Sequence, residues 1–123
     1  MPEFHANAGE YVIRSGEAGN SLYLLMAGSV GVYLPSSTGG KPKRLEVFEA
    51  GRSFGEMSFL DGSERSADVI ALEPITYRVI DREIFKRIGK ERAALKLQLL
   101  EQLCRQMSIN LRKANIEISA FRD

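Results

Sequence analysis

The glycines of this 123-residue chain are concentrated in its first part, and this distribution restricts where long helices can form. Ten of the eleven glycines lie within the first 62 residues, and only Gly89 lies beyond them. Glycine inside a helix costs about 1 kcal/mol relative to alanine, whereas it readily adopts the backbone angles of tight turns. We therefore expect short strands and turns in the first part. Its glycines are Gly9, Gly16, Gly19, Gly28, Gly31, Gly39, Gly40, Gly51, Gly55 and Gly62.

The segments between these glycines have the composition of short β-strands. Val30, Val32 and Leu34 alternate with smaller or more polar residues, as in a strand with one buried face. Short strands at regular spacing with glycine-rich turns predict a mainly β fold, an antiparallel sandwich or barrel. Residues 35–42 are expected to form an exposed, mobile hairpin tip. The predicted strands are Tyr11–Ile13, Leu22–Met26, Val30–Leu34, Arg44–Phe48, Ala67–Leu72 and Ile75–Ile80.

From Asp81 onward the chain consists mainly of strong helix formers and contains no proline. Asp81 is expected to cap a short helix that ends at Ile88. A long helix is expected from Lys90 to about Ile118, with Gly89 as a hinge between the two helices.

Apolar residues of the long helix repeat at alternating intervals of four and three, which is the heptad spacing of a coiled coil. A second stripe, Leu95, Leu99 and Leu103, lies on another face. We expect one face to pack on the strands and the other to form a homodimer through the helix 93–118. The alternative is a monomer with one wide core-facing stripe. The heptad residues are Ala93, Leu97, Leu100, Cys104, Met107, Leu111, Ala114 and Ile118.

Length and composition exclude several classes of protein. The chain is long enough for a single domain, residues 1–123, and its 44% hydrophobic content can supply a core. No apolar run approaches the roughly 18 residues of a membrane span, and no secretory signal is recognisable, so we expect a cytoplasmic protein without membrane insertion. A single cysteine, Cys104, and a single histidine, His5, offer neither a disulfide nor a metal site. We expect no enzyme activity and no cofactor.

Charge is nearly balanced overall but uneven along the chain. The formal net charge is +1, which argues against binding nucleic acid or anionic membranes through bulk charge. Residues 1–80 carry 7 basic and 10 acidic side chains, and residues 81–123 carry 10 and 6. The basic helix is expected to be a solvated face, because no groove-reading motif accompanies it.

The most specific pattern in the sequence is Phe54-Gly55-Glu56, followed nine residues after Glu56 by Arg65 and then by Ser66-Ala67. Together with the ordered upstream glycines, it resembles the cyclic nucleotide-binding domain family over about residues 4–120. The resemblance implies an antiparallel β-roll over residues 4–80, with C-terminal helices over 81–120. It also implies that residues 54–67 form the family's phosphate-binding cassette.

The side chains of this segment suit a cyclic phosphodiester, whose single negative charge must leave water on binding. Arg65 offers a planar guanidinium that is always charged, and each charge-assisted hydrogen bond contributes about 1.5–3 kcal/mol. The resemblance implies that Glu56 accepts a hydrogen bond from the ribose 2′-hydroxyl and that Ser66 donates to a phosphate oxygen or to guanine. The alternative is an ordinary Glu56–Arg65 ion pair without a ligand. Asp68 departs from the family pattern and would weaken binding unless strand alternation directs it outward.

Residues 102–110 resemble the dimer helix of bacterial catabolite activator proteins. In that comparison Asn110 lies where the helix meets the purine, and its amide suits the adenine edge. Asn110 is equally suited to fix helix register. The resemblance therefore favours cyclic AMP over cyclic GMP as the ligand. The nucleotide-binding residues that it implies are Phe54, Gly55, Glu56, Met57, Ser58, Arg65, Ser66, Ala67 and Asn110.

We expect a regulatory module that binds a 3′,5′-cyclic purine nucleotide and relays occupancy through its C-terminal helices to an attached effector domain or a dimer partner. The sequence ends about where the helix-turn-helix of an activator would begin, so we expect no direct contact with nucleic acid and a place within a larger protein. A ligand-free domain that serves only for dimerisation is the main alternative. A transcription regulator truncated before its DNA-binding module is another, and a cupin-like enzyme is disfavoured by the missing histidines.

Overall fold

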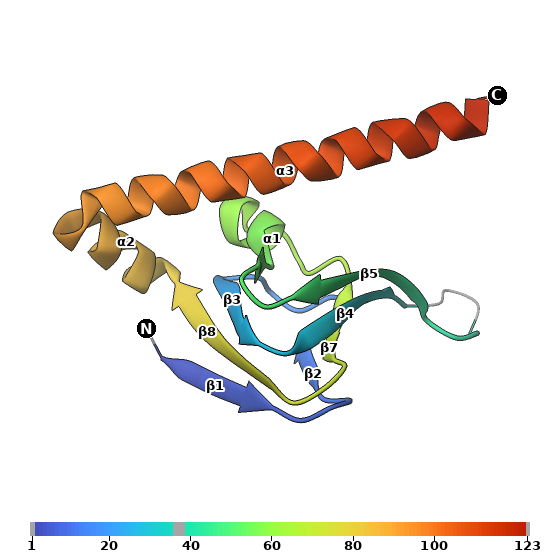
Figure 1. Ribbon diagram of the computed structural model, residues 1–123, viewed down its shortest axis with the longest axis horizontal. Helices are drawn as coiled ribbons and strands as arrows, with labels where there is room; N and C mark the ends of the chain where they lie inside the picture. Colours follow the sequence, from blue (N-terminus) through green and yellow to red (C-terminus); the bar gives the residue numbers. More distant parts are fainter. Residues whose placement is uncertain (1, 36–38, 123) are drawn as a thin grey trace. The chain divides into compact units, whose positions relative to one another are not determined.

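Strands from the first 81 residues assemble into two four-stranded antiparallel sheets (Figure 1). The structure is a computed structural model that describes residues 2–35 and 39–122, without the side chains of residues 114 and 117–122. One sheet has the order β1-β8-β3-β6 and the other has the order β2-β7-β4-β5. The strands are β1 (Glu3–Ala6), β2 (Tyr11–Ile13), β3 (Ser21–Ala27), β4 (Ser29–Leu34), β5 (Lys43–Glu49), β6 (Ser53–Phe54), β7 (Asp68–Ala71) and β8 (Ile75–Asp81).

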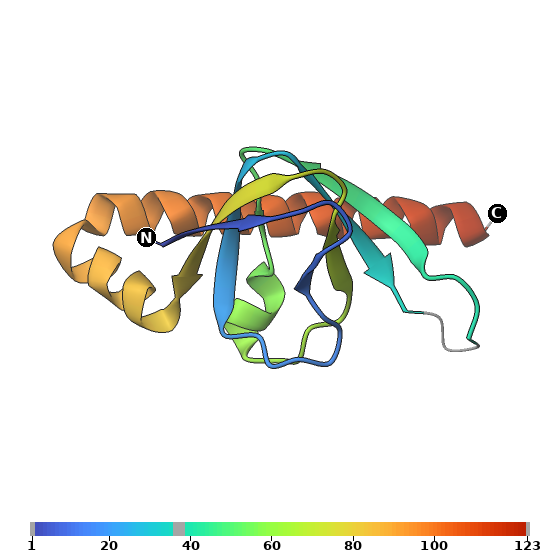
Figure 2. The ribbon, with the colours of Figure 1, turned by 90° about the horizontal axis from the view of Figure 1, so that it is seen from below.

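All six predicted strands are present, and their ends agree with the structure to within one residue. The sequence pattern missed β1 and the two-residue β6. β1 is largely exposed and has little apolar alternation, and it forms by pairing with β8, from Glu3 opposite Arg78 to Ala6 opposite Ile75 (Figure 2). β6 is too short for any periodicity and is defined by its pairing with β3.

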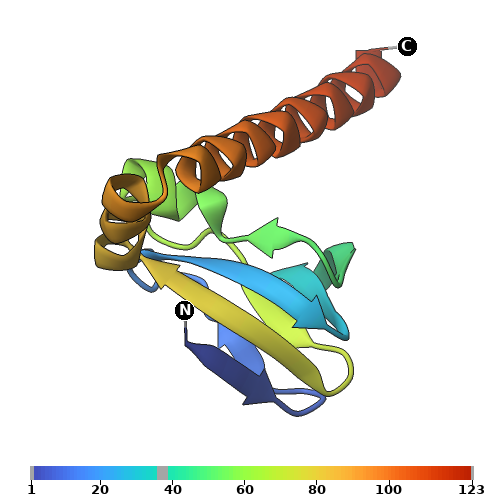
Figure 3. The ribbon, with the colours of Figure 1, turned by 60° about the vertical axis from the view of Figure 1, so that its left-hand side comes forward.

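The core lies between the two sheets, and both contribute to it. In Figure 3, β1, β8 and β3 run side by side in the first sheet. The first sheet buries Ala6, Leu25, Phe54 and Ile75, and the second buries Ile13, Val30, Val69 and Ala71. The predicted mainly β fold with C-terminal helices is confirmed.

The predicted hairpin joins β4 to β5, which pair as far as Leu34 opposite Lys43. Pro35 and residues 39–42 are exposed, as expected. Residues 36–38 of the predicted tip lie outside the described part of the chain. The mobility of the tip stays a prediction.

The chain divides into two units, Met1–Ile84 and Phe85–Asp123, and the boundary falls within the first of the two C-terminal helices. These helices are α2 (Arg82–Glu91) and α3 (Ala93–Arg122). Asp81 caps α2 as predicted, because its Oδ1 accepts a hydrogen bond of 2.8 Å from the backbone N–H of Ile84. Over the residues that the structure describes, neither helix has an apolar stretch long enough to cross a bilayer.

The predicted helix boundary at Gly89 is wrong. α2 continues through Gly89 to Glu91, and the break lies at Arg92, so α3 starts three residues later than the expected Lys90. The backbone at Gly89 is ordinary helix, and the side chain of Lys96 lies beside it. Neither glycine nor proline marks the break at Arg92, which explains why composition misplaced it.

The heptad residues of α3 are largely exposed in the single chain. Leu97, Met107 and Leu111 are 59, 43 and 64% exposed, and Cys104 is exposed as well. The side chains of Ala114 and Ile118, the last two heptad residues, lie outside the described part. The homodimer and the single-domain organisation over residues 1–123 stay predictions.

Candidate functional site

The predicted cassette folds as a short helix between two strands. Gly55 joins β6 to α1 (Glu56–Asp61), and Gly62 ends this helix. Both glycines have positive φ angles, 78° and 73°, which other residues rarely adopt, so each fixes one end of α1. Hydrogen bonds from the side chain and the backbone N–H of Ser63 lower the pKa of the Asp61 carboxyl. Residues within the predicted cassette therefore determine where its short helix begins and ends.

A cavity of about 130 Å³ opens beside this turn, within the first unit. All eight cassette residues predicted as nucleotide-binding line it, so the structure brings together side chains up to 13 positions apart in the sequence. These residues are Phe54, Gly55, Glu56, Met57, Ser58, Arg65, Ser66 and Ala67.

Sequence reasoning missed four apolar residues of the cavity lining, one each from β2, β4, β5 and β7. We call these residues, Ile13, Val32, Phe48 and Val69, the apolar wall. Part of the signal was available, because Val69 follows the motif by only two residues and, with Ala71, forms the alternating buried face of β7. The residues of the predicted cassette therefore share the cavity with these four apolar side chains.

Arg65 lies in the cavity wall, and its side chain is only 6% exposed. Its Nη1 donates to the carbonyl oxygen of Gly55 at 2.8 Å, and its Nη2 donates to the carbonyl oxygen of Ser21 at 2.7 Å. The backbone is held too, because the N–H of Arg65 donates to Glu17 O, and its carbonyl accepts from Gly16 N, both at 2.8 Å. Hydrogen bonds therefore hold Arg65 both at its backbone and at its guanidinium.

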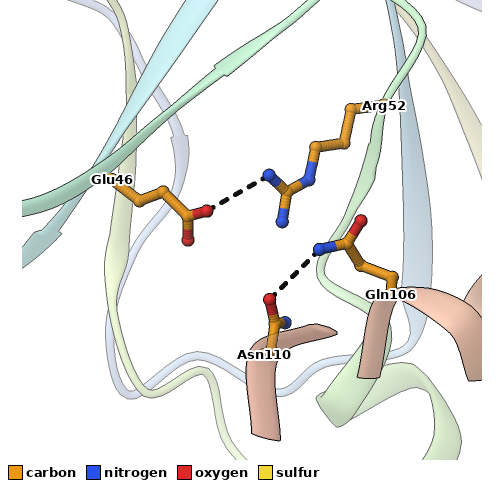
Figure 4. A network of polar contacts seen from close by, with 4 residues as sticks. All are labelled: Glu46, Arg52, Gln106 and Asn110. Atoms are coloured by element: carbon orange, nitrogen blue, oxygen red, sulfur yellow. Dashed lines mark hydrogen bonds and ion pairs between the residues drawn. The ribbon is translucent and has the colours of Figure 1, made fainter. Parts of the chain in front are cut away.

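No carboxylate pairs with Arg65 within residues 2–35 and 39–122. Ion pairs elsewhere in this part join Arg52 to Glu46 at 3.2 Å, shown in Figure 4, and Arg78 to Glu3 at 3.6 Å. The alternative of a Glu56–Arg65 ion pair is thus wrong. A guanidinium has five N–H donors, and the two carbonyls use two of them. A buried charge without a counter-ion is costly, so an anion that enters the cavity would be strongly favoured.

The approach of α1 to the loop before β3 depends on Gly19. A Cβ on Gly19 would lie 2.1 Å from Ser58 Cβ and 3.1 Å from Arg65 Cζ, closer than atoms can come without movement. Gly55 is required for a similar reason, since a Cβ there would lie 2.8 Å from Arg65 Nη1. The Arg65 side chain therefore occupies the space beside Gly55.

The remaining polar residues of the cassette differ in their surroundings. Glu56 is half-buried in the cavity wall, and within the described residues its carboxylate accepts no hydrogen bond. Ser66 is exposed at the cavity, and the Oγ of the buried Ser58 donates to Glu64 O at 3.2 Å. Asp68 does not line the cavity, and its Oδ1 accepts a hydrogen bond of 2.7 Å from Ser15 N.

Asn110 belongs to the second unit. Its Oδ1 accepts a hydrogen bond of 3.1 Å from Gln106 Nε2, one turn earlier in α3 (Figure 4). This contact occupies one acceptor of the amide and leaves its NH₂ group. The predicted contact of Asn110 with a purine stays a prediction. Among the described residues, no cluster of three His, Cys, Asp or Glu side chains could hold a metal ion.

Comparison with known proteins agrees with this geometry. The model of the family "Cyclic nucleotide-binding domain" matches residues 3–92. The chain belongs to this family. The chain is 31% identical to the cAMP-dependent protein kinase regulatory subunit of Dictyostelium discoideum over 109 residues, and the match covers 89% of the chain and 33% of that protein. It is 36% identical to the cGMP-dependent protein kinase, isozyme 1, of Drosophila melanogaster over 96 residues, and the match covers 76% of the chain and 12% of that protein.

Solved structures show the same fold. The chain resembles the crystal structure of the Thermus thermophilus catabolite activator protein with a TM-score of 0.83 and 28% identity, over 98% of this chain and 55% of the other. The predicted β-roll of the family is thereby confirmed. The domain spans a third or less of the two kinase-related proteins, so their activities as whole proteins are not carried over to it.

Proposed function

We propose that the domain binds a 3′,5′-cyclic purine nucleotide, with the cyclic phosphate at Arg65. The observation that carries this proposal is the buried guanidinium of Arg65, which lines the cavity without a carboxylate partner in the described residues. A cyclic phosphodiester supplies one negative charge and acceptor oxygens for the three N–H groups that the carbonyls leave. The ligand would supply the counter-charge that the Arg65 guanidinium lacks.

The size and lining of the cavity support a site that encloses only part of the nucleotide. Its volume of about 130 Å³ is below the roughly 300–1,000 Å³ of pockets that enclose whole drug-sized ligands. The half-buried Glu56 offers an acceptor for the ribose 2′-hydroxyl, and the apolar wall with Val32 and Val69 offers contact for the ring carbons. Phosphate and ribose would lie inside, and the purine would project outward.

Cyclic AMP is favoured over cyclic GMP in this proposal. The support is the likeness to the catabolite activator protein and the position of Asn110 in α3, where its NH₂ group can donate to a ring nitrogen of adenine. One of the two kinase-related proteins is named for cAMP and the other for cGMP, so their names do not decide which base this chain would bind. Ser66 is compatible with either base.

We further propose that occupancy is relayed from the cassette to the C-terminal helices through α2. α2 starts in the first unit and continues into the second. In its first turn, Arg82 donates a hydrogen bond to the carbonyl oxygen of Phe59 in α1, and its guanidinium lies 5.3 Å from the centre of the Phe59 ring. A ligand that orders α1 would therefore act directly on the start of α2.

A homodimer through α3 remains part of the proposal. The exposed heptad residues Leu97, Met107 and Leu111 support it, because exposed apolar stripes on long helices mark helix–helix interfaces. An attached or partner effector domain would receive the signal. If the domain is a dimer but binds no nucleotide, it serves for dimerisation only.

Isothermal titration with cyclic AMP and cyclic GMP tests the binding proposal. The wild type should bind, and Arg65→Gln should bind about ten- to a hundredfold more weakly, because one charge-assisted interaction contributes about 1.5–3 kcal/mol. Arg44→Gln is the matched control, since Arg44 is exposed on β5 and does not line the cavity. It should bind as the wild type does. No heat with either nucleotide, from folded wild-type protein, would overturn the proposal.

Hydrogen exchange tests the relay. Adding saturating cyclic AMP should protect amides of residues 90–118 in the wild type. Arg82→Gln should bind nucleotide but lose this protection, whereas Arg87→Gln, an exposed charge change later in α2, should keep it. Equal protection in both variants would show that the signal does not pass through Arg82.

A further inference from the structure

A row of aromatic rings starts beside Arg65 and runs through the first sheet. The guanidinium carbon of Arg65 lies over the ring of Tyr23, 5.5 Å from its centre. Tyr23 stacks on Phe54, its partner across β3 and β6, with ring centres 5.2 Å apart and planes 11° apart. On its other side it contacts Tyr77 of β8 in a tilted arrangement, with centres 5.9 Å apart. Neighbours on two strands therefore hold the Tyr23 ring in place.

Tyr23 does not line the cavity, so the ring acts on the site only through its neighbours. One of its carbons, Cδ2, lies close enough to Gly55 that a Cβ on that residue would approach to 3.2 Å. The ring thus fills the space beneath both Gly55 and the Arg65 guanidinium. Together with the carbonyls of Gly55 and Ser21, it confines the guanidinium.

The choice of an aromatic face has a consequence for the charge of the site. The face of a phenol ring carries partial negative potential and attracts a guanidinium, but it has no net charge. A carboxylate in the same place would neutralise Arg65 and would compete with an incoming anion. The ring orients the arginine and leaves its positive charge available.

We propose that Tyr23 is a positioning residue that orients the Arg65 guanidinium toward the cyclic phosphate before the ligand arrives. This inference rests on the proposed function, because it assigns Tyr23 a role in the same site. Without the ring, the two carbonyls alone would hold the guanidinium, and its remaining freedom would be lost only on binding. Ordering one long side chain lowers affinity about three- to tenfold, so the loss expected for Tyr23→Leu is up to about tenfold.

Titration with cyclic AMP of Tyr23→Leu and Tyr23→Phe tests the proposal. Tyr23→Phe keeps the ring and should restore wild-type affinity. Tyr77→Leu, which removes a ring of the same row that makes no contact with Arg65, should lower stability but leave the affinity close to that of the wild type. Wild-type affinity in Tyr23→Leu would overturn the proposal, as would an equal loss in Tyr23→Leu and Tyr77→Leu.

Two further measurements separate positioning from general packing. In the Arg65→Gln background, Tyr23→Leu should cause no additional loss, because the ring acts through the guanidinium. Replacing the ring at position 23 with pentafluorophenylalanine keeps its shape but removes the negative face, and it should weaken binding relative to Tyr23→Phe even if Tyr23→Leu does not fold. Equal affinity of these two isosteric rings would contradict the proposal. If the wild type itself binds no nucleotide, the proposed function fails. If the wild type binds and the Tyr23 variants bind with the same affinity, only the inference about Tyr23 fails.

Discussion

Replacing Gly19 with alanine should displace α1 and disturb the Arg65 side chain. The added Cβ would lie 2.1 Å from Ser58 Cβ, whereas carbon atoms in contact lie about 3.5–4.0 Å apart. Ser58 Cβ is attached directly to the backbone of α1, so rotation of a side chain cannot relieve the overlap. Either α1 or the loop before β3 must move by more than about 1 Å. Arg65 is affected as well, because its Cζ would be 3.1 Å from the new methyl group.

The cost has two parts that different assays measure. Overpacking of this kind lowers the free energy of unfolding by about 1–3 kcal/mol. Misalignment of the Arg65 guanidinium should weaken cyclic nucleotide binding about tenfold or more, if one charge-assisted interaction is lost. Urea unfolding followed by circular dichroism gives the first quantity, and isothermal titration gives the second.

Asn20→Ala is the control for Gly19→Ala, because Asn20 is the next residue and is exposed. It should leave both the free energy of unfolding and the affinity near their wild-type values. Gly19→Ala with wild-type stability and wild-type affinity would refute the reasoning, since it would show that the loop and α1 do not approach as closely as described.

Three other predictions concern the helices, the core and the cavity. Gly89→Ala should raise the free energy of unfolding by up to about 1 kcal/mol, because Gly89 is helical and the new methyl would meet only the flexible side chain of Lys96. A lower free energy of unfolding in urea would contradict this. Burial and the nearby Tyr23 and Glu10 raise the pKa of the Tyr77 hydroxyl above its ordinary value of 10.0. The contribution of this group to stability is therefore present below pH 10 and is lost as the pH rises through the higher pKa of the folded state. In urea unfolding at increasing alkaline pH, the free energy of unfolding should decline less in Tyr77→Phe than in the wild type. Asp68→Asn should leave the affinity for cyclic nucleotide unchanged in titration, because the Asp68 carboxylate accepts a hydrogen bond from Ser15 N and does not line the cavity. A large gain in affinity would contradict this, since it would place the Asp68 charge near the phosphate.

The strands and the cassette were predictable because local rules define them. Turns at glycines with positive φ separate the strands, and Gly55 and Gly62 mark the two ends of α1. The predicted alternation in β4 holds in part, because Val30 is buried and Val32 half-buried, whereas Leu34 is exposed. The motif around Arg65 identified one wall of the cavity, because those residues are close in sequence.

Features that depend on long-range contacts were not predictable in the same way. The apolar wall with Ile13 and Phe48 comes from strands far apart in the chain, and no motif joins them to the cassette. β1 exists because β8 offers it a pairing edge, not because of its own composition. The break at Arg92 has no glycine or proline to mark it, and the contact of Arg65 with Tyr23 depends on strand register.

The central claim is that the unpaired buried charge of Arg65 receives a cyclic phosphate. A crystal structure of the domain with cyclic AMP tests it most directly. The account predicts phosphate oxygens about 2.7–2.9 Å from the Arg65 guanidinium, with the ribose hydroxyl beside Glu56. A nucleotide bound elsewhere, or a phosphate that leaves Arg65 bonded only to the carbonyls of Gly55 and Ser21, would contradict it.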